Sequence, residues 1–258
     1  MSHRTLYLAW QDRIATRAWY PIGRLDVNEI IHEFSYTRGA LTAQAQAGFQ
    51  ALPSFPDLKG RYRSQELFSF FRNRLLGSSR QDFAGYLDWL GMSEGQFDPL
   101  EVLAVTGGER QTDNFEVFSK IKKESTGHFK CRFFLHGQRH VHESARQRIE
   151  SFRVHEPLRI CLEYNNPATS RAVQLQTEDY VMIGWAPRYL VGDLAEAALA
   201  SGDLGAKIVK VNTGRVPANM RVLIELVGRL PPNYEPMVTD EFRLIDGQVE
   251  TSEAPLAN

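Results

Sequence analysis

Apolar and polar positions alternate along the first part of the chain, a pattern typical of strands with one buried face. Residues 4–25 are predicted to form a β-hairpin that closes near Asp12 and Arg13. Residues 34–40 predict a further short strand and turn, and the prolines at 53 and 56 exclude a helix interior there. The apolar positions of the hairpin are Leu6, Leu8, Trp10, Ala18, Trp19 and Ile22. A sheet therefore begins the protein.

From Ser64 the apolar spacing changes to that of a helix face, and it recurs ahead of Gly91, which would end a second helix. A third helix is expected with Asp98 as its N-cap and Pro99 at its first position, ending before Gly107. The apolar positions of the first two are Leu67, Phe68, Phe71, Leu75, Leu76, Phe83, Tyr86, Leu87 and Leu90. We expect the first two of these helices, those before Gly91, to pack on the first sheet.

The second half of the chain has a β pattern. Six short apolar runs predict strands at residues 131–135, 158–162, 172–175, 181–185, 206–211 and 222–226. One helix, from Tyr189 to Ala200, is expected among them. Short strands with a single helix favour a compact β-barrel over a parallel α/β sheet.

The chain of 258 residues is long enough for two modules. The predicted fold class is α+β, with a sheet-plus-helices module over residues 1–118 and a small barrel over 129–237. The polar residues 119–128 are the expected linker, and residues 238–258 the expected polar C-terminal tail.

The composition is that of an ordinary globular protein, with 43% hydrophobic and 24% charged residues. No apolar run approaches the length of a membrane span, and the first residues lack the order of a secretory signal, so we expect a cytoplasmic protein without a membrane partner. Cys131 and Cys161 lie among apolar residues and are expected to be buried thiols rather than a disulfide.

Positive charge is concentrated at the start of the second module. The formal net charge of the whole chain is −1, yet residues 120–159 hold ten lysines and arginines against four glutamates. Such a local excess is expected where a protein binds a polyanion. A solvated surface without a partner is the alternative explanation.

An ordered set of motifs runs through the second module. Phe133–His140, Glu163-Tyr164-Asn165-Asn166-Pro167, and Ile183-Gly184-Trp185-Ala186-Pro187-Arg188 followed by a helix give the order strand, Asn-Asn-Pro turn, strand, Gly-aromatic-x-Pro-Arg corner. This order resembles a HIRAN domain over nearly the whole module. The resemblance implies an OB-like barrel that binds single-stranded DNA, in particular a free 3′ end.

The resemblance also implies site residues. Arg139 and His140 match a basic and aromatic pair whose ring stacks on a terminal base, Asn166 lies in the turn that frames the pocket, and Trp185 and Arg188 match the corner where a planar group and a cation meet base and phosphate. Where the family has an aromatic and then an acidic residue after the turn, this chain has Ala168 and Thr169, which puts recognition of a 3′-hydroxyl in doubt.

The chemistry of these residue types supports nucleic-acid binding without the resemblance. Sequence-tolerant binding of a single strand needs cations along the phosphates and flat side chains for the bases, and each stacked base contributes roughly 1–3 kcal/mol. The candidate residues of both kinds are Arg132, Arg139, His140, Trp185 and Arg188. The alternative is that Trp185 fills the core and the Gly-Trp-Ala-Pro corner is only a turn.

The first module is similar to the N-terminal subdomain of HipA-type toxin kinases. The similar segments are Phe34-Ser35-Tyr36, residues 52–56, residues 67–76, and Asp98–Leu103 followed by Gly107-Gly108. That subdomain is a scaffold and protein-contact element, so the resemblance implies a protein-interaction module rather than a phosphoryl-transfer site.

No known catalytic motif is present. The chain lacks a Walker-type loop, a His-Arg-Asp loop, a Gly-x-Ser-x-Gly elbow and a paired-cysteine zinc ribbon, so neither enzymatic activity nor a cofactor is expected. His136, His140, His142 and His155 lack the paired spacing of a zinc site, although His140 and His142 would share one face of a strand. Glutamates 143, 150, 156 and 163 are interpreted as surface charge.

The sequence thus predicts an accessory protein that binds single-stranded or end-bearing DNA, in DNA maintenance or defence. A protein-interaction component of a toxin–antitoxin or regulatory complex is the alternative, in which the first module docks a partner. A hydrolase or nuclease with an unrecognised site is a third possibility. Preference for DNA or RNA, the oligomeric state, the partner and the pathway are left open.

Overall fold

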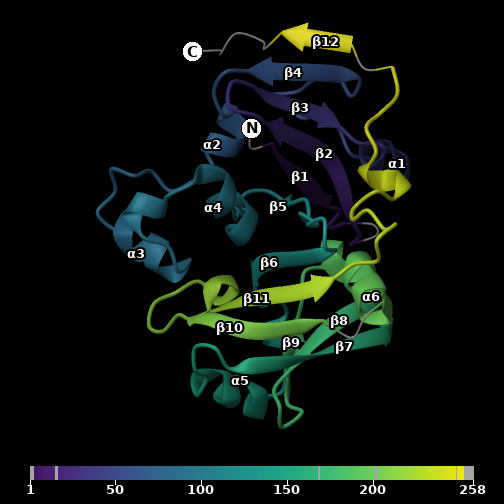
Figure 1. The fold of residues 1–258 in the computed structure, drawn as a ribbon. Helices are drawn as coiled ribbons and strands as arrows, with labels where there is room; N and C mark the ends of the chain where they lie inside the picture. Colours follow the sequence, from purple (N-terminus) through teal and green to yellow (C-terminus); the bar gives the residue numbers. More distant parts are fainter. Residues whose placement is uncertain (1–2, 15–16, 168, 201–202, 248, 253–258) are drawn as a thin grey trace. The chain divides into compact units, whose positions relative to one another are not determined.

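A computed structural model describes residues 3–14, 17–167, 169–200, 203–247 and 249–252. Its contacts divide the chain into two compact units (Figure 1). The first unit comprises Met1–Arg80, Asp98–Lys120 and Met237–Asn258, and the second comprises Gln81–Phe97 and Ile121–Pro236. These units differ from the predicted modules at three places. Residues 81–97, expected in the first module, belong to the second unit, and residues from 237 onward return to the first. The expected linker is divided between the units, with residues 119–120 in the first and residues 121–128 in the second.

The first unit is built on a sheet with the strand order β12-β4-β3-β2-β1-β5. Its strands are β1 (Arg4–Gln11), β2 (Trp19–Val27), β3 (His32–Tyr36), β4 (Gly60–Ser64), β5 (Phe115–Ser119) and β12 (Val249–Ser252). β1 and β2 pair antiparallel from Arg4↔Val27 to Gln11↔Trp19, which confirms the predicted hairpin. β12 pairs with β4 in parallel, so residues predicted to be a tail add a strand to this sheet. Residues 253–258 of that predicted tail lie outside the described residues.

The helices of the first unit are α1 (Arg38–Ala47), α2 (Ser69–Arg72) and α4 (Pro99–Thr106), with a short turn η5 (Asp240–Phe242). The helix after Asp98 is confirmed, because the Asp98 side chain accepts a hydrogen bond from the Leu100 N–H at 3.0 Å and Gly107 ends the helix with a φ of +73°. The long helix predicted from Ser64 is wrong. The chain leaves the helix after Arg72, and the next arginine, Arg74, turns inward to an ion pair.

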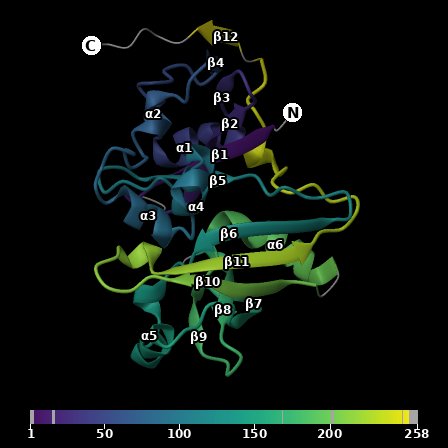
Figure 2. The same ribbon diagram turned by 60° about the vertical axis from the view of Figure 1, so that its left-hand side comes forward.

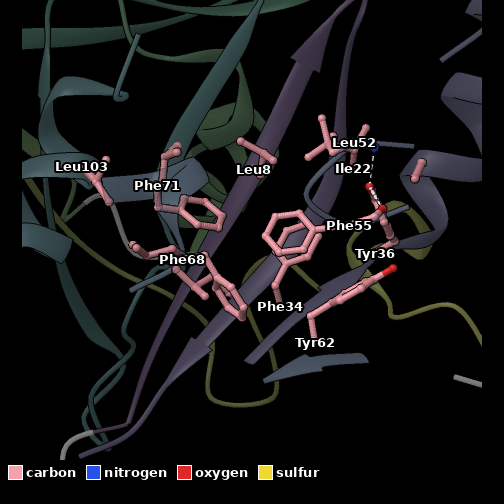
Figure 3. Close-up of a cluster of buried hydrophobic side chains, with 14 of the residues drawn as sticks. Leu8, Ile22, Phe34, Tyr36, Leu52, Phe55, Tyr62, Phe68, Phe71 and Leu103 are labelled. Carbon is pink, nitrogen blue, oxygen red and sulfur yellow. Dashed lines mark hydrogen bonds between the residues drawn. The ribbon is translucent and has the colours of Figure 1, made fainter. Parts of the chain in front are cut away.

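Aromatic side chains fill the core of the first unit (Figure 3). Phe34 on β3 stacks on Phe55 with ring centroids 4.1 Å apart. The hydroxyl of Tyr36 donates to the Phe55 carbonyl and accepts from the Leu52 N–H, both at 2.7 Å. The proline-rich segment 52–56 is therefore held against the sheet by a buried phenol, which explains why it needs neither a helix nor a strand of its own.

The second unit contains an antiparallel sheet with the strand order β6-β11-β10-β7-β8-β9 (Figure 2). Its strands are β6 (His128–Phe134), β7 (Pro157–Asn166), β8 (Ser170–Gln176), β9 (Met182–Trp185), β10 (Gly205–Val211) and β11 (Val222–Arg229). All six strands predicted for this part of the chain are thereby confirmed. The side chains of Phe133, Val173, Leu175, Ile183, Ile208 and Ile224 are at most 2% exposed and form the buried face of this sheet.

The helices of the second unit are α3 (Phe83–Trp89), α5 (Glu143–Glu150) and α6 (Val191–Ala200), with short turns η1 (Glu94–Gln96), η2 (Gln138–His140), η3 (Arg188–Leu190) and η4 (Ala218–Met220). The expectation of a single helix here is wrong. α5 buries only Ala145 and Ile149, and two apolar positions in eight residues are too few to give a helical period. α3 was expected on the first sheet, but Lys210 binds Asp88 on it at 2.7 Å within the second unit.

The fold is mixed α+β, as predicted at that level. In its strand order the second sheet is open, with β6 and β9 at its edges. An isolated antiparallel bridge nevertheless joins Trp185, at the end of β9, to His136, two residues beyond β6. Each of the two residues donates its N–H to the carbonyl of the other at 3.0 Å. Within the described residues no helix has the length and apolar character needed to cross a membrane.

Candidate nucleic-acid interface

Trp185 is held at the edge of the second sheet by backbone and side-chain contacts together. The His136 bridge fixes its backbone. Its ring lies directly on Gly137, since a Cβ atom placed on Gly137 would be only 2.3 Å from Trp185 Cε3. Gly137 has a φ of +73°, a conformation that glycine adopts at low cost. The indole is half-buried, so it is neither a core residue nor a freely moving surface group.

The indole N–H is bound by a carboxylate. Trp185 Nε1 donates to Glu163 Oε2 at 2.9 Å, and Asn166 Nδ2 donates to the same oxygen at 3.0 Å. These two hydrogen bonds, with a further one from Gln174, lower the pKa of Glu163 against the opposing effect of desolvation. Glu163 is therefore ionised at neutral pH and fixes the edge of the indole.

Arg139 and His140 lie in the turn η2, which follows Gly137 directly. Both side chains are exposed, and Arg139 Nε donates to His140 Nε2 at 2.9 Å. Among the described residues Arg139 makes no ion pair, so a guanidinium and a flat ring are presented together beside the residue on which Trp185 rests.

Arg188 follows the Trp185-Ala186-Pro187 corner and is exposed. Its charge acts on His136, the residue bridged to Trp185. Burial, and in second place the positive charge of Arg188, lower the pKa of His136 to about 4. His136 is thus neutral at physiological pH, and the charge at this corner comes from the arginines 139 and 188.

Asn166 has a structural role in the β7–β8 turn. Its side-chain oxygen accepts from the Thr169 N–H at 3.1 Å and from the Thr169 hydroxyl at 3.0 Å, while its amide nitrogen binds Glu163. Asn166 thus frames the site rather than pointing a free amide at a ligand. Ala168, one of the two departures from the family pattern, lies outside the described residues.

Arg132 belongs to a different group of charges. Its Nη2 lies 2.8 Å from Glu225 Oε2, and Lys207 approaches the other oxygen of that carboxylate at 3.0 Å. Lys130 is 4.0 Å from the same group. Of the six predicted site residues, five lie around Glu163, Gly137 and His136, and Arg132 lies on the β6–β11–β10 part of the sheet.

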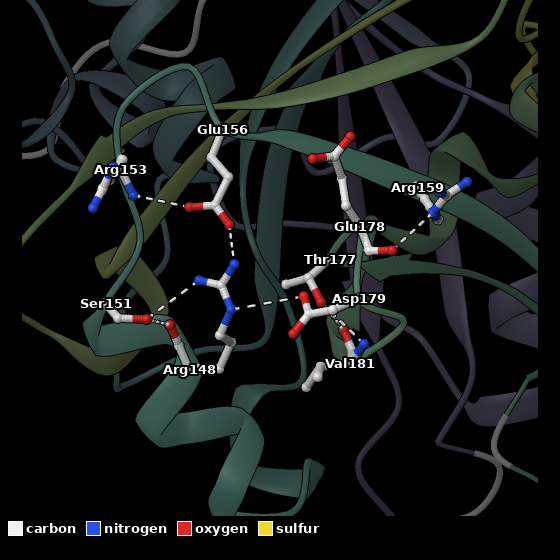
Figure 4. Close-up of polar contacts among 9 residues, drawn as sticks. All are labelled: Arg148, Ser151, Arg153, Glu156, Arg159, Thr177, Glu178, Asp179 and Val181. Atoms are coloured by element: carbon white, nitrogen blue, oxygen red, sulfur yellow. Dashed lines mark hydrogen bonds and ion pairs between the residues drawn. The ribbon is translucent and has the colours of Figure 1, made fainter.

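Acidic residues offset part of the basic excess of residues 120–159. Figure 4 shows Arg148 between Glu156 and Asp179, with its Nε 3.8 Å from Asp179 Oδ1. Arg146 pairs with Glu143, and Lys123 donates to three backbone carbonyls, of Pro231, Pro232 and Tyr234. Much of the local charge therefore holds the unit together. The arginines at 139, 153 and 159 make no ion pair with a described carboxylate.

The histidines do not share a strand face. His140 lies in η2, and His142 is the N-cap of α5, where its side chain accepts from the Ser144 N–H. No three histidine, cysteine, aspartate or glutamate side chains of the described chain lie close enough to hold a metal ion. Cys131 and Cys161 are free thiols, as predicted, but each is half-buried and not fully buried as expected. Desolvation raises the pKa of Cys131 to about 12.

Two residues of this site were missed in the sequence analysis. Glu163 was interpreted as surface charge, and Gly137 was noted only as part of a motif. The Asn-Asn-Pro turn, which begins two residues after Glu163, was a signal for the glutamate, because a strand that ends in such a turn places its last side chains beside the neighbouring strand. Nothing in the sequence indicates that Gly137 carries the indole.

Comparisons with known proteins give no family. No family model and no curated protein matches the chain. Among solved structures, a crystal structure of a protein from Lactobacillus plantarum, a structural-genomics target, has 16% identity and a TM-score of 0.31. The match covers 40% of this chain and 97% of that one, and a similarity this low carries no argument about function.

Proposed function

We propose that the second unit binds single-stranded nucleic acid, with single-stranded or end-bearing DNA as the ligand, and that the protein is an accessory factor in DNA maintenance or defence. The observation that carries this is the Trp185 indole, held half-exposed on Gly137 and Glu163 and flanked by Arg139, His140 and Arg188. A fixed aromatic ring stacks on any base, and the arginines supply cations for the phosphates.

We also propose that the second sheet acts as an OB-like barrel. The bridge between His136 and Trp185 supports this, because it brings the end of β9 against the chain that continues from β6, the opposite edge of the sheet. The α6 helix, which follows β9 and contacts β8 and β11, would then cover one end of the barrel. The ligand would then lie on the outer surface, where Trp185 is anchored.

The test uses the full-length protein and a fluorescently labelled oligodeoxythymidylate, with an oligouridylate in parallel. Binding should be measurable at low salt and fall as salt rises, since phosphate contacts release counterions. Trp185→Ala should weaken binding by about 1–3 kcal/mol, the contribution of one stacked base, while Trp185→Phe should retain most of the affinity. Thermal unfolding of both variants checks that the fold is kept.

Arg188→Ala should also weaken binding and reduce its salt dependence. The matched control is Arg146→Ala, which removes the same charge from an exposed arginine of helix α5. A wild-type protein that binds neither oligonucleotide would refute the proposal, as would a Trp185→Ala variant of unchanged affinity. A protein partner that stays bound after nuclease treatment would instead support the protein-interaction alternative.

A further inference from the structure

An exposed aromatic residue on the β8–β9 turn has no role in the site described above. Tyr180 is 71% exposed and has a φ of +64°, a conformation that costs a non-glycine residue energy. The turn is held by the fully buried Thr177, whose N–H donates to the Val181 carbonyl and whose hydroxyl accepts from the Val181 N–H, both at 3.0 Å. A rigid, strained turn thus presents a phenol ring outward.

Arg159 on β7 lies over this ring, with its guanidinium carbon 4.7 Å from the ring centroid. Its Nε donates to the Glu178 carbonyl at 3.3 Å, a contact drawn in Figure 4. Within the described part of the chain Arg159 makes no ion pair with a carboxylate. Two acids precede Tyr180 on the turn, and the charge of one of them, Asp179, is offset by Arg148. Arg159 and Tyr180 therefore combine a cation and a flat ring.

The strand register places both groups on one face of the sheet. Arg159 is paired with Gln176, and Gln174 is paired with Trp185. Paired residues lie on the same face, as do residues two apart in one strand, so Arg159 and Trp185 share a face. Two hydrogen bonds agree with this register, from Gln176 to Gln174 at 3.2 Å and from Trp185 to Glu163, the latter four residues along β7 from Arg159.

The separation of the two groups suits one extended ligand. Four residues of strand span about 13 Å, from Arg159 to the glutamate that holds Trp185. Between them the face carries Cys161 and the polar side chains of Gln174 and Gln176, all half-buried. The two glutamines offer donors and acceptors but no charge. Single-strand sites on OB folds cover about 4–16 nucleotides, more than one stacked base requires.

We infer that Arg159 and Tyr180 form a second phosphate and base contact for the same single strand, which crosses the outer face of β7, β8 and β9 from Trp185 to the β8–β9 turn. This rests on the proposed function. It adds the path of the ligand, a further stacking residue and a third arginine, none of which the family resemblance implies.

The experiment measures the affinity of the full-length protein for a dodecamer of deoxythymidine. Tyr180→Leu keeps apolar bulk but removes the flat ring, and should weaken binding about 5- to 150-fold, the range that one stacked base gives. Tyr180→Phe keeps the ring and should bind within about twofold of wild type. Because Tyr180 is so exposed, neither change removes a core contact, and thermal unfolding checks this.

Arg159→Gln should reduce the slope of log affinity against log salt by about 0.7, the value for one phosphate contact on a single strand. The matched control is Arg153→Gln, which should leave the slope unchanged. Arg153, seen in Figure 4, is also exposed and makes no ion pair with a described carboxylate, but its side chain covers no described ring. Equal affinities of Tyr180→Leu and Tyr180→Phe, or equal slopes for the two arginine variants, would overturn the inference. If wild type binds no oligonucleotide, the proposed function itself fails, which is a different result.

Discussion

Gly137 offers the sharpest test of the candidate site, because a single methyl group added there would clash with the indole of Trp185. A Cβ on Gly137 would lie 2.3 Å from Trp185 Cε3 and 2.7 Å from Cζ3, whereas carbon atoms in contact are normally about 3.5–4.0 Å apart. In Gly137→Ala the ring must therefore move by roughly 1 Å or more. Such a shift breaks the 2.9 Å hydrogen bond from the indole to Glu163.

The loss of stability expected for Gly137→Ala is the sum of two effects, and a substitution at a second glycine measures one of them alone. Gly137 has a φ of +73°, and an alanine in that conformation costs about 1–2 kcal/mol whatever surrounds it. Gly214 has a φ of +77°, and no described atom lies within 4 Å of the point that an added Cβ would occupy, so Gly214→Ala measures the backbone cost alone. Loss of a hydrogen bond to a charged group adds about 1.5–3 kcal/mol in Gly137→Ala.

Urea unfolding gives the stability of the two variants, and oligonucleotide titration gives their affinity. We expect Gly137→Ala to lose about 1.5–3 kcal/mol more stability than Gly214→Ala, and to bind the single strand more weakly, while Gly214→Ala binds as wild type does. Equal losses of stability in the two variants would refute the account of how the indole is anchored. A displaced indole with full affinity would show that Trp185 does not contact the ligand.

Two further predictions concern buried charge. Arg74 is paired with Asp113 at 2.7 Å, and its side chain is 2% exposed. Arg74→Met should therefore destabilise the first unit by about 3–5 kcal/mol in urea unfolding. Arg72 forms an exposed pair, so Arg72→Met should cost less than about 1 kcal/mol, and similar losses for the two variants would contradict this prediction. The pKa of His136 is lowered to about 4, so the unfolded chain binds more protons below about pH 6.5, and stability should fall as the pH drops from there towards 4. Arg188→Ala should raise that pKa, and a His136 NMR signal that titrates near pH 6.5 in the folded protein would contradict the assignment.

Local signals in the sequence were sufficient for most strands and for the helices α3, α4 and α6. The hairpin of β1 and β2 and the six strands of the second unit follow from alternation and apolar runs, and Asp98-Pro99 with Gly107 marks α4 at both ends. These signals depend only on residues near in sequence. They predict whether a segment is a helix or a strand, but not which other elements it pairs or packs with.

The elements that sequence reasoning missed depend on distant residues. α1 buries Gly39, Ala40 and Ala43, and a Cβ on Gly39 would lie 2.1 Å from the Pro21 carbonyl oxygen, so small size rather than apolar period places this helix on the sheet. β12 forms only because β4, almost two hundred residues earlier, offers it an edge with which to pair. No local pattern contains either fact.

The site shows the same limit in its charges. Arg132 and Arg139 look alike in the sequence, but the sheet register sets Arg132 opposite Glu225, while Arg139 lies in a turn where its described contact is His140. Whether a cation is available to a ligand is thus decided by the residue across the sheet.

The charges around Trp185 constrain how a single strand of nucleic acid would lie on the proposed site. Glu163 is ionised and holds the N–H edge of Trp185, so a phosphate placed at that edge would meet a negative charge. The arginines 139 and 188 flank the residues that carry the indole, Gly137 and His136. A single strand therefore gains most when its base covers the ring and its phosphates follow the arginines, with the sugar–phosphate chain turned away from Glu163. Replacing Glu163 by an uncharged residue would remove the repulsion but would also release the indole ring. The Glu163 carboxylate therefore helps to orient the ligand, although it adds negative charge to a basic surface.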